Sequence, residues 1–236
     1  MNNSNQDDFL IIVQARMGSS RFPGKSFCEI KGIPTLQHLI DSLLVNFSKN
    51  QICIATSILS DNDVIRNFCL DNKISVFSGD EHNVASRFYE VLKSKKHNYF
   101  VRLNGDSPLF CSKELKNHIY NYSIDINIHG YSTIINRNYP KGNNFEIFKT
   151  KTFLDNYCNF EHAEHFEHVT SYFYENLHQF NIEQIKFEYD GYEDVNLCFD
   201  TIEDFNRLSN IFDSLTKPHF EYSLIEKCYL YRNLLK

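Results

Sequence analysis

A short segment near the start of the sequence combines positive charge with small residues. It reads ARMGSSRFPGK and carries Arg16, Arg21 and Lys25 beside Gly18 and Ser19. Small residues let backbone N–H groups approach a ligand closely, and arginine and lysine neutralise its charge. This combination predicts a triphosphate-binding loop, although a solvated basic surface loop would have a similar composition.

The end of this segment mimics the phosphate-binding motif of P-loop NTPases. Gly24, Lys25 and Ser26 match its last three positions, but five residues separate Gly18 from Gly24, where the motif has four. Pro23 also lacks a backbone N–H at a point where the motif uses one. We therefore expect a triphosphate loop of a different type.

Two aspartates follow apolar segments that are expected to be strands. Asp106 lies in NGDSPL after the segment NYFVRL, and Asp200 follows VNLCF. Ligands of open α/β sheets collect at the carboxyl ends of the strands, where Mg²⁺ typically uses one or two carboxylates with phosphate oxygens. Each residue has a structural alternative, because Asp106 could close a turn and Asp200 could cap the next helix.

Three histidines alternate with glutamates between positions 161 and 168. His162, His165 and His168 are three residues apart, so on a helix they would fan out by about 60° per step. Zinc sites on helices prefer ligands four residues apart. We therefore expect a mixed polar helix face rather than a zinc site.

The elements that must position these residues alternate between strand and helix patterns in the first half. Residues 9–13 form an almost unbroken apolar run, as in a strand buried on both faces of a parallel sheet. Further strands are predicted at 51–57, 74–79 and 98–103, and helices at 35–44, 63–72, 80–94 and from 112. This alternation predicts an α/β fold with a mostly parallel, doubly wound sheet.

Beyond about residue 125 the pattern loosens into a smaller α+β elaboration. Strands are predicted at 126–135, 144–148, 182–189 and 195–199, and helices at 150–157, 162–176, 201–212 and 222–235. No repeat or linker interrupts the chain. We expect one domain over residues 1–236, with a nucleotide-binding half at about 9–124 and a second half at about 125–236.

Composition narrows the function classes. The net charge of −6 argues against a general nucleic-acid binder and suits a small polyanionic ligand in a local basic site. Seven cysteines without a CxxC motif are typical of buried thiols in a reducing cytosol. The acidic start MNNSNQDD has no signal-peptide pattern, and no apolar run is long enough to cross a membrane. We therefore expect a cytoplasmic protein that acts without nucleic acid or membrane.

Six motifs follow one another along almost the whole chain. They are FLIIVQARMGSSRFPGK, SGDEHNVASRFYEV, VRLNGDSPLF, YPKGNNFEIF, EHVTSYFYEN and CFDTIEDF. Together they resemble bacterial cytidylyltransferases of the spore-coat polysaccharide type, which are related to acylneuraminate and CMP-KDO synthetases. The resemblance implies a glycosyltransferase-A-like nucleotidyltransferase fold and transfer of CMP from CTP.

The resemblance also implies roles for individual residues. Lys25, Arg16 and Asp106 would be catalytic, and Asp106 would bind Mg²⁺ together with Asp200. The nucleotide would contact Ala15, Arg16, Gly18, Ser19, Arg21, Lys25, Arg87 and Asn104. Glu146, Glu167 and His168 would bind the acceptor or support the residues that do, since the second half of the chain is expected to form the acceptor side.

One motif departs from the family pattern. Many relatives carry Gly-Leu-Asp-Val-Glu, where this chain has GNNFE ending at Glu146. The missing carboxylate at Asn144 leaves the acceptor open. His168 is a candidate base if that acceptor is an ordinary hydroxyl, although a structural histidine is the alternative.

These features predict a Mg²⁺-dependent cytidylyltransferase. It would transfer CMP to a sugar acid, sugar phosphate or polyol phosphate and release pyrophosphate, for capsule or surface-polysaccharide assembly. Its partners would be CTP and an anionic small molecule, and the family resemblance suggests a homodimer. Two alternatives are a glycosyltransferase that uses a nucleotide sugar on the same fold and a non-catalytic nucleotide-binding module. The sequence does not decide between CTP and another NTP.

Overall fold

The fold is built around β1 (Phe9–Gln14), which pairs in parallel with a strand on each side. The computed structural model describes residues 8–19, 21–121 and 127–234, and in it β1 lies between β4 (Ile52–Ser57) and β6 (Tyr99–Asn104). Along β1, Leu10 and Ile12 pack into one apolar cluster, and Ile11 and Val13 into another on the opposite face. This explains the unbroken apolar run, because both faces of the strand are buried.

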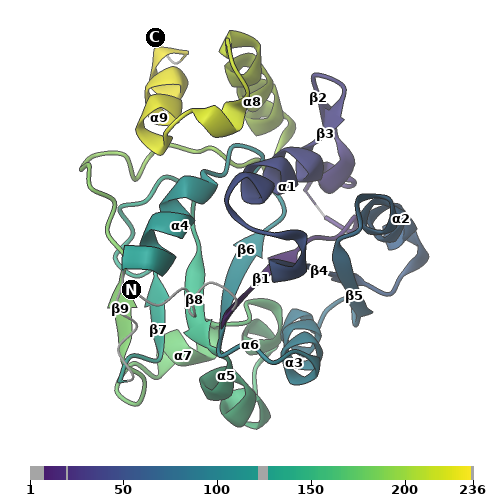
Figure 1. The fold of residues 1–236 in the computed structure, drawn as a ribbon, viewed down its shortest axis with the longest axis vertical. Helices are drawn as coiled ribbons and strands as arrows, with labels where there is room; N and C mark the ends of the chain where they lie inside the picture. Colours follow the sequence, from purple (N-terminus) through teal and green to yellow (C-terminus); the bar gives the residue numbers. More distant parts are fainter. Residues whose placement is uncertain (1–7, 20, 122–126, 235–236) are drawn as a thin grey trace.

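Seven strands form one sheet in the order β5-β4-β1-β6-β8-β7-β9 (Figure 1). The remaining strands are β5 (Ser75–Gly79), β7 (Gly130–Ser132), β8 (Glu146–Lys149) and β9 (Ile182–Gln184). The sheet is parallel from β5 to β6, and β8 is antiparallel to both β6 and β7. A separate hairpin joins β2 (Glu29–Ile30) to β3 (Ile33–Pro34). The predicted α/β fold with a mostly parallel sheet is confirmed.

Helices cover both faces of the sheet. On the face of Ile11 lie α1 (Thr35–Asn46), α2 (Asp63–Asn72), α4 (Ser112–Asn121), α8 (Ile202–Ser214) and α9 (Leu224–Asn233). On the face of Leu10 lie α3 (Val84–Ser94), α5 (Thr150–Asn156) and the region of α6 (Ala163–Glu167) and α7 (Ser171–Glu175). Short 3₁₀ helices occur at Lys25–Phe27, Lys49–Gln51, Ser60–Asn62, Tyr157–Asn159 and His219–Glu221. The sheet is therefore doubly wound.

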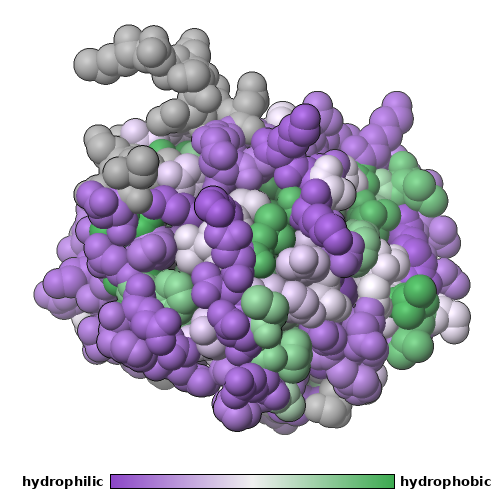
Figure 2. Space-filling model, turned by 90° about the horizontal axis from the view of Figure 1, so that it is seen from below, coloured by the Kyte–Doolittle hydropathy of each residue, from purple (hydrophilic) through white to green (hydrophobic). Residues whose placement is uncertain are grey.

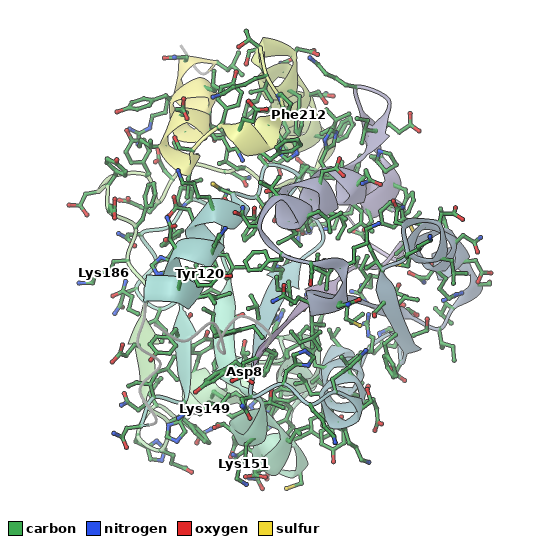
Figure 3. The ribbon with its side chains drawn as sticks, in the orientation of Figure 1. Asp8, Tyr120, Lys149, Lys151, Lys186 and Phe212 are labelled. Carbon is green, nitrogen blue, oxygen red and sulfur yellow. The ribbon has the colours of Figure 1, made fainter. Side chains whose placement is uncertain are left out.

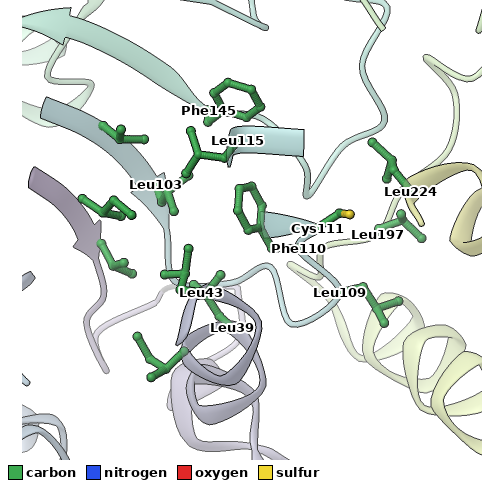
Figure 4. Packing of buried hydrophobic residues seen from close by; sticks show 14 of the residues in the cluster. Leu39, Leu43, Leu103, Leu109, Phe110, Cys111, Leu115, Phe145, Leu197 and Leu224 are labelled. Carbon is green, nitrogen blue, oxygen red and sulfur yellow. The ribbon is translucent and has the colours of Figure 1, made fainter. Parts of the chain in front are cut away.

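The C-terminal helices pack against the first half of the chain. Figure 4 shows Leu39 and Leu43 of α1 near Leu109, Phe110 and other buried side chains from both halves. In α8, the ring of Phe212, at the upper end of Figure 3, lies 4.4 Å from that of His38 in α1. Residues after β6 are thus enclosed by elements from both halves. The face drawn in Figure 2 is mainly hydrophilic, with hydrophobic side chains interspersed in small patches.

Two predicted elements of the second half are wrong. The helix predicted at 162–176 is divided into α6 and α7, because Val169 between them has a φ of +48°. The strand predicted at 195–199 forms only an isolated bridge between Lys141 and Asn196. The strand predicted at 182–189 shortens to β9, and that predicted at 126–135 to β7.

Some predictions fall outside the described residues. They concern the acidic start at 1–7, the start of the 126–135 strand, the boundary near residue 125 and the end of the C-terminal helix at 235. Within the described ranges, no helix is long and apolar enough to cross a membrane.

Candidate functional site

The loop after β1 is folded onto itself by backbone hydrogen bonds. The carbonyl of Met17 accepts hydrogen bonds from the N–H groups of Ser19 and Gly24, each at 2.9 Å. Gly24 has a φ of +76°, which glycine adopts without strain. The hydroxyl of Thr35, the first residue of α1, donates to the carbonyl of Lys25 at 2.6 Å. These contacts fix Lys25 beside the carboxyl end of β1.

Lys25 lies between the two carboxylates that were predicted to bind metal. Its Nζ atom is 2.6 Å from Oδ2 of Asp106 and 2.9 Å from Oδ1 of Asp200. Burial alone would lower the pKa of this ammonium group, but Asp106 and Asp200 outweigh that effect and raise its pKa. Arg21 lies 3.0 Å from Oδ2 of Asp200. The structure thus brings both aspartates and two loop cations to one point.

Asp200 does not cap α8, so this structural alternative is wrong. The N-cap is Thr201, whose hydroxyl accepts a hydrogen bond from the backbone N–H of Asp204 at 3.2 Å. The carboxylate of Asp204 in turn accepts from the backbone N–H of Asp200 at 3.2 Å. The Asp200 carboxylate is therefore free of capping and points to Lys25 and Arg21.

The segment before Asp200 is held by a close backbone contact. Leu197 donates its N–H to the carbonyl of Lys141 at 2.8 Å. Gly142, which follows Lys141 in the chain, has a φ of +84°, and a Cβ there would lie 2.5 Å from the carbonyl carbon of Leu197. Only glycine allows this approach. The YPKGNN motif therefore helps to place the second carboxylate.

A second glycine brings the Asp106 loop against the end of β1. The N–H of Gly105 donates to the carbonyl of Gln14 at 2.9 Å. A Cβ at Gly105 would lie 2.8 Å from that of Ala15, which is closer than real side chains come. This packing holds Asp106 next to the loop that was predicted to bind a triphosphate.

From the other side, a buried lysine of α9 supports the same loop. Lys227 is fully buried, and its Nζ atom donates to the carbonyls of Leu109 and Phe110 at 3.0 and 3.4 Å. Burial lowers the pKa of Lys227 to about 8. The last helix therefore stabilises a loop in the first half.

Arg16 and Arg87 are held by the loop that precedes α3. The NH1 group of Arg16 donates to the backbone carbonyl of Glu81 at 3.1 Å and to its carboxylate at 3.0 Å. The NH2 group of Arg87 donates to the same carbonyl at 3.0 Å. Burial lowers the pKa of Arg87 to about 10. Arg16 is the more exposed of the two and is better placed to change partners.

These residues line a cleft of about 360 Å³ at the carboxyl ends of β1 and β6. Its walls carry five arginine or lysine side chains and three carboxylates, although the whole chain has a net charge of −6. The predicted site residues in its walls are Ala15, Arg16, Ser19, Arg21, Lys25, Arg87, Asn104, Asp106, Glu167, His168 and Asp200. Such a surface suits a polyanion.

Two predicted site residues do not line the cleft. Gly18 lies beside Glu81, where a Cβ would be 2.9 Å from Oε1 of that residue. Glu146 is 1% exposed and reaches the cleft only through Arg102, whose NH1 group donates to its Oε2 atom at 2.5 Å. Thr170 and Tyr174 donate to the other carboxylate oxygen of Glu146.

Glu167 and His168 reach the cleft at the break between α6 and α7. Val169, which follows them, is fully buried and has a φ of +48°, a rare conformation for a β-branched residue. Such a backbone costs roughly 1–3 kcal/mol and persists only where the surrounding packing enforces it. His165 is separate from the cleft, because its ring is buried and its Nε2 atom lies 2.9 Å from Glu175.

Several residues of the site were missed from the sequence. Gln14 and Arg102 line the cleft, and Glu81 anchors Arg16. Arg102 had a detectable signal, because a charged residue interrupts the apolar strand NYFVRL. Gln14 and Glu81 had no such signal, since their partners are distant in the sequence.

Comparison with known proteins agrees with this geometry. Residues 10–234 match the cytidylyltransferase family. The chain belongs to that family. A solved cytidylyltransferase from Leptospira borgpetersenii has 26% identity and a TM-score of 0.88, with 97% of this chain and 95% of that chain covered. The predicted nucleotidyltransferase fold and family are therefore confirmed.

Two curated relatives of this cytidylyltransferase span different shares of the chain. An uncharacterised protein of Methanocaldococcus jannaschii is 32% identical over 82% of this chain and 79% of its own length. The spore coat polysaccharide biosynthesis protein SpsF of Bacillus subtilis is 34% identical over 46% of this chain and 47% of its own length. The structure of a CMP-2-keto-3-deoxy-manno-octonic acid synthetase complexed with CTP has 16% identity and a TM-score of 0.65, with 88% of this chain and 99% of that chain covered. That last likeness concerns the fold.

Proposed function

We propose that this cytidylyltransferase transfers CMP from CTP to an anionic sugar or polyol derivative and releases pyrophosphate. The acceptor would be a sugar acid, a sugar phosphate or a polyol phosphate used in surface polysaccharides, capsules included. The observation that carries the proposal is the meeting of Lys25, Asp106 and Asp200 at 2.6 and 2.9 Å in a cleft with an excess of cationic side chains.

The reaction needs positioning and charge neutralisation more than covalent help from the protein. An oxygen of the acceptor attacks the α-phosphorus of CTP and forms a new P–O bond. The bond from the α-phosphorus to the bridging oxygen breaks, and its electron pair leaves with pyrophosphate. Arg16, Arg21 and Lys25 would neutralise the β- and γ-phosphates and the departing pyrophosphate.

Asp106 and Asp200 fit a Mg²⁺ ion. Their carboxylates converge on one cation, the Lys25 ammonium, so this structure already places a positive charge between them. Two carboxylates with phosphate oxygens and water form a donor set that Mg²⁺ commonly uses. When bound there, Mg²⁺ would supply positive charge to the phosphates at the reacting end of CTP. In this structure, burial and the charges of Asp106 and Asp200 raise the pKa of the Cys198 thiol to about 12.

The acceptor would enter from the side of Glu167 and His168. Both line the cleft, and Oε1 of Glu167 lies 3.8 Å from the NH2 group of Arg16. An acceptor that is already ionised needs no strong base. If it carries an ordinary hydroxyl, His168 is the side chain in the wall that could accept its proton.

Pyrophosphate release tests the proposal. The protein is incubated with Mg²⁺, each of the four NTPs in turn, and a panel of sugar acids, sugar phosphates and polyol phosphates. Release that needs both CTP and one acceptor supports the proposal and names the substrate. Release of a nucleoside diphosphate from a nucleotide sugar would favour a glycosyltransferase instead. A protein that binds no nucleotide would contradict both.

A further inference from the structure

A charged residue on the middle strand of the sheet faces the cleft beyond the triphosphate loop. Arg102 is opposite Ile12 of β1 on one side and opposite Glu146 of β8 on the other. It therefore stands where the sheet changes from parallel to antiparallel pairing. Because side chains alternate along a strand, Asn104 points to the same face two residues further on. Both line the cleft, and Asp106 follows them.

The Arg102 guanidinium is held in one orientation by its neighbours. Its Nε–H group donates to Oε1 of Gln14 at 3.1 Å, and its NH1 group donates to Oε2 of Glu146 at 2.5 Å. The Arg102 side chain is 10% exposed and that of Glu146 is 1% exposed. Little freedom remains to be lost when a ligand binds, so the group is preorganised.

Glu146 is itself held by a second layer of hydrogen bonds. Thr170 donates to its Oε1 atom at 2.7 Å, and the hydroxyl of Tyr174 donates to the same atom. Burial and the charge of Glu146 raise the pKa of Tyr174, so its hydroxyl keeps its proton. Tyr174 also contacts Oγ of Ser132 at 2.8 Å. The whole network therefore serves to fix Arg102 rather than to fill the cleft.

One donor group of Arg102 is left over. Its NH2 nitrogen makes no hydrogen bond to any residue in the described ranges, and it is not buried out of reach of solvent. A buried ion pair adds little stability compared with apolar residues of the same shape. A purely structural pair would therefore gain nothing from an arginine that also lines the cleft and keeps a donor group without a protein partner in the described ranges.

We propose that Arg102 binds an anionic oxygen of the acceptor and that Glu146 is its positioning residue. The inference rests on the proposed function, because it assigns the acceptor end of the same cleft. A carboxylate and a phosphate ester both present the oxygen that a fixed guanidinium recognises. Arg102 would thereby hold the acceptor next to Asn104, on the side of the α-phosphorus.

The test uses NMR of protein labelled with ¹⁵N-arginine and measures the shift of the Arg102 Nε–H resonance as an anion is added. The Arg102→Lys variant identifies this resonance, because the variant lacks it. Acetate stands for a carboxylate and inorganic phosphate for a phosphate ester, with chloride as the reference anion. We expect a saturable shift with acetate or phosphate at concentrations about tenfold below those needed with chloride. A stronger response to acetate indicates a sugar acid, and a stronger response to phosphate indicates a phosphate ester. Arg66, which binds Asp63 and the carbonyl of Ser57, is the internal control and should not move.

Two further measurements separate the possible failures. In Glu146→Gln the charge that balances Arg102 is lost, so the anion concentration for half-saturation should fall several-fold; an unchanged value would overturn the positioning role. Protein that binds CTP but shows no saturable Arg102 shift overturns the inference alone. Protein that shows the Arg102 shift but binds no CTP overturns the proposed function and leaves an anion site at Arg102.

Discussion

At the triphosphate end of the cleft the ion pairs join distant loops and stay partly exposed, whereas at the Arg102 end the ion pair is buried between neighbouring strands. The side chains of Lys25, Asp106 and Asp200 are 17%, 19% and 33% exposed. Those of Arg102 and Glu146 are 10% and 1% exposed. Partly hydrated pairs separate at a small energetic cost, but opening a buried pair leaves an uncompensated charge. The charged side chains at the first end can therefore exchange their ion-pair partners, whereas Arg102 and Glu146 stay paired.

This difference assigns separate tasks to the two ends. Under the proposed function, the triphosphate of CTP would bring a large negative charge, and Lys25, Arg16 and Arg21 would exchange their carboxylate partners for phosphates. The acceptor end instead offers Arg102 in an orientation that Gln14 and Glu146 hold fixed.

The largest effect is expected at Asp106. Asp106→Asn keeps the shape of the side chain but removes the negative charge that pairs with Lys25 and that would bind Mg²⁺. We expect kcat/KM for CTP-dependent pyrophosphate release to fall by roughly 10³-fold or more. Asp213→Asn is the matched control, because that side chain is 70% exposed at the far end of α8. A folded Asp106→Asn protein with normal turnover would exclude a role for Asp106 in the reaction.

Lys25→Met tests whether the Lys25 ammonium group and a metal ion would occupy the same position between Asp106 and Asp200. Loss of this cation should lower kcat by roughly 10²–10³-fold, as for removal of one donor at a developing charge. Without nucleotide, two unbalanced carboxylates should bind Mn²⁺ more tightly than in the wild type, which electron paramagnetic resonance can measure. Lys151→Met, at a lysine that is 84% exposed, is the control. Equal Mn²⁺ affinities would show that Lys25 does not compete with the metal.

Lys227 supports the loop at Leu109 and Phe110, so Lys227→Met should lower the stability of the folded protein. The substitution leaves the carbonyls of Leu109 and Phe110 without their donor, so the free energy of unfolding at pH 7.5 should fall by about 1–3 kcal/mol.

The pKa of Lys227 is lowered from 10.5 to about 8 by burial, so between these pH values the folded state binds fewer protons than the unfolded state. Stability from this group therefore rises with pH across that window. Urea unfolding at pH 7.5 and 9.5 should show the gap between wild type and variant widening; a constant gap would contradict the lowered pKa.

The smallest effect is expected at Arg21. Its side chain is 67% exposed, and its pairing with Asp200 is screened by solvent. Arg21→Ala should raise the KM for CTP by about twofold to fivefold at low ionic strength, and the difference should shrink in about 0.5 M salt. A large, salt-independent loss would place Arg21 among the fixed residues instead.

The first half of the fold could be predicted well because its signals are local. The apolar run of β1 and the amphipathic helix α2 are visible in the sequence, and α2 has the predicted bounds. The second half was harder, since its strands are short and Val169 breaks a helix pattern through packing that no local signal reveals. The segment before Asp200 looked like a strand but makes only a single bridge to Lys141.

The site shows the same division. Sequence reasoning identified both aspartates but left open whether they meet, because they lie 81 and 175 positions after Lys25, the residue that joins them. Glu146 was assigned to the acceptor side, but its place behind Arg102 depends on the pairing of β6 with β8. Residues whose role depends on strand order can be recognised only once that order is known.

The separation of the partners of Lys25 has a consequence for protein synthesis. Asp106 follows Lys25 by 81 positions and Asp200 by 175. On the ribosome, β1, β4, β5 and β6 can therefore assemble while Lys25 has only its first partner, and α9 has not yet been made to support the Asp106 loop. The second carboxylate can join the cleft only after the chain has been extended as far as Asp200, 175 positions beyond Lys25. A growing chain thus cannot present a complete cleft to CTP before the sequence that folds around it has been made.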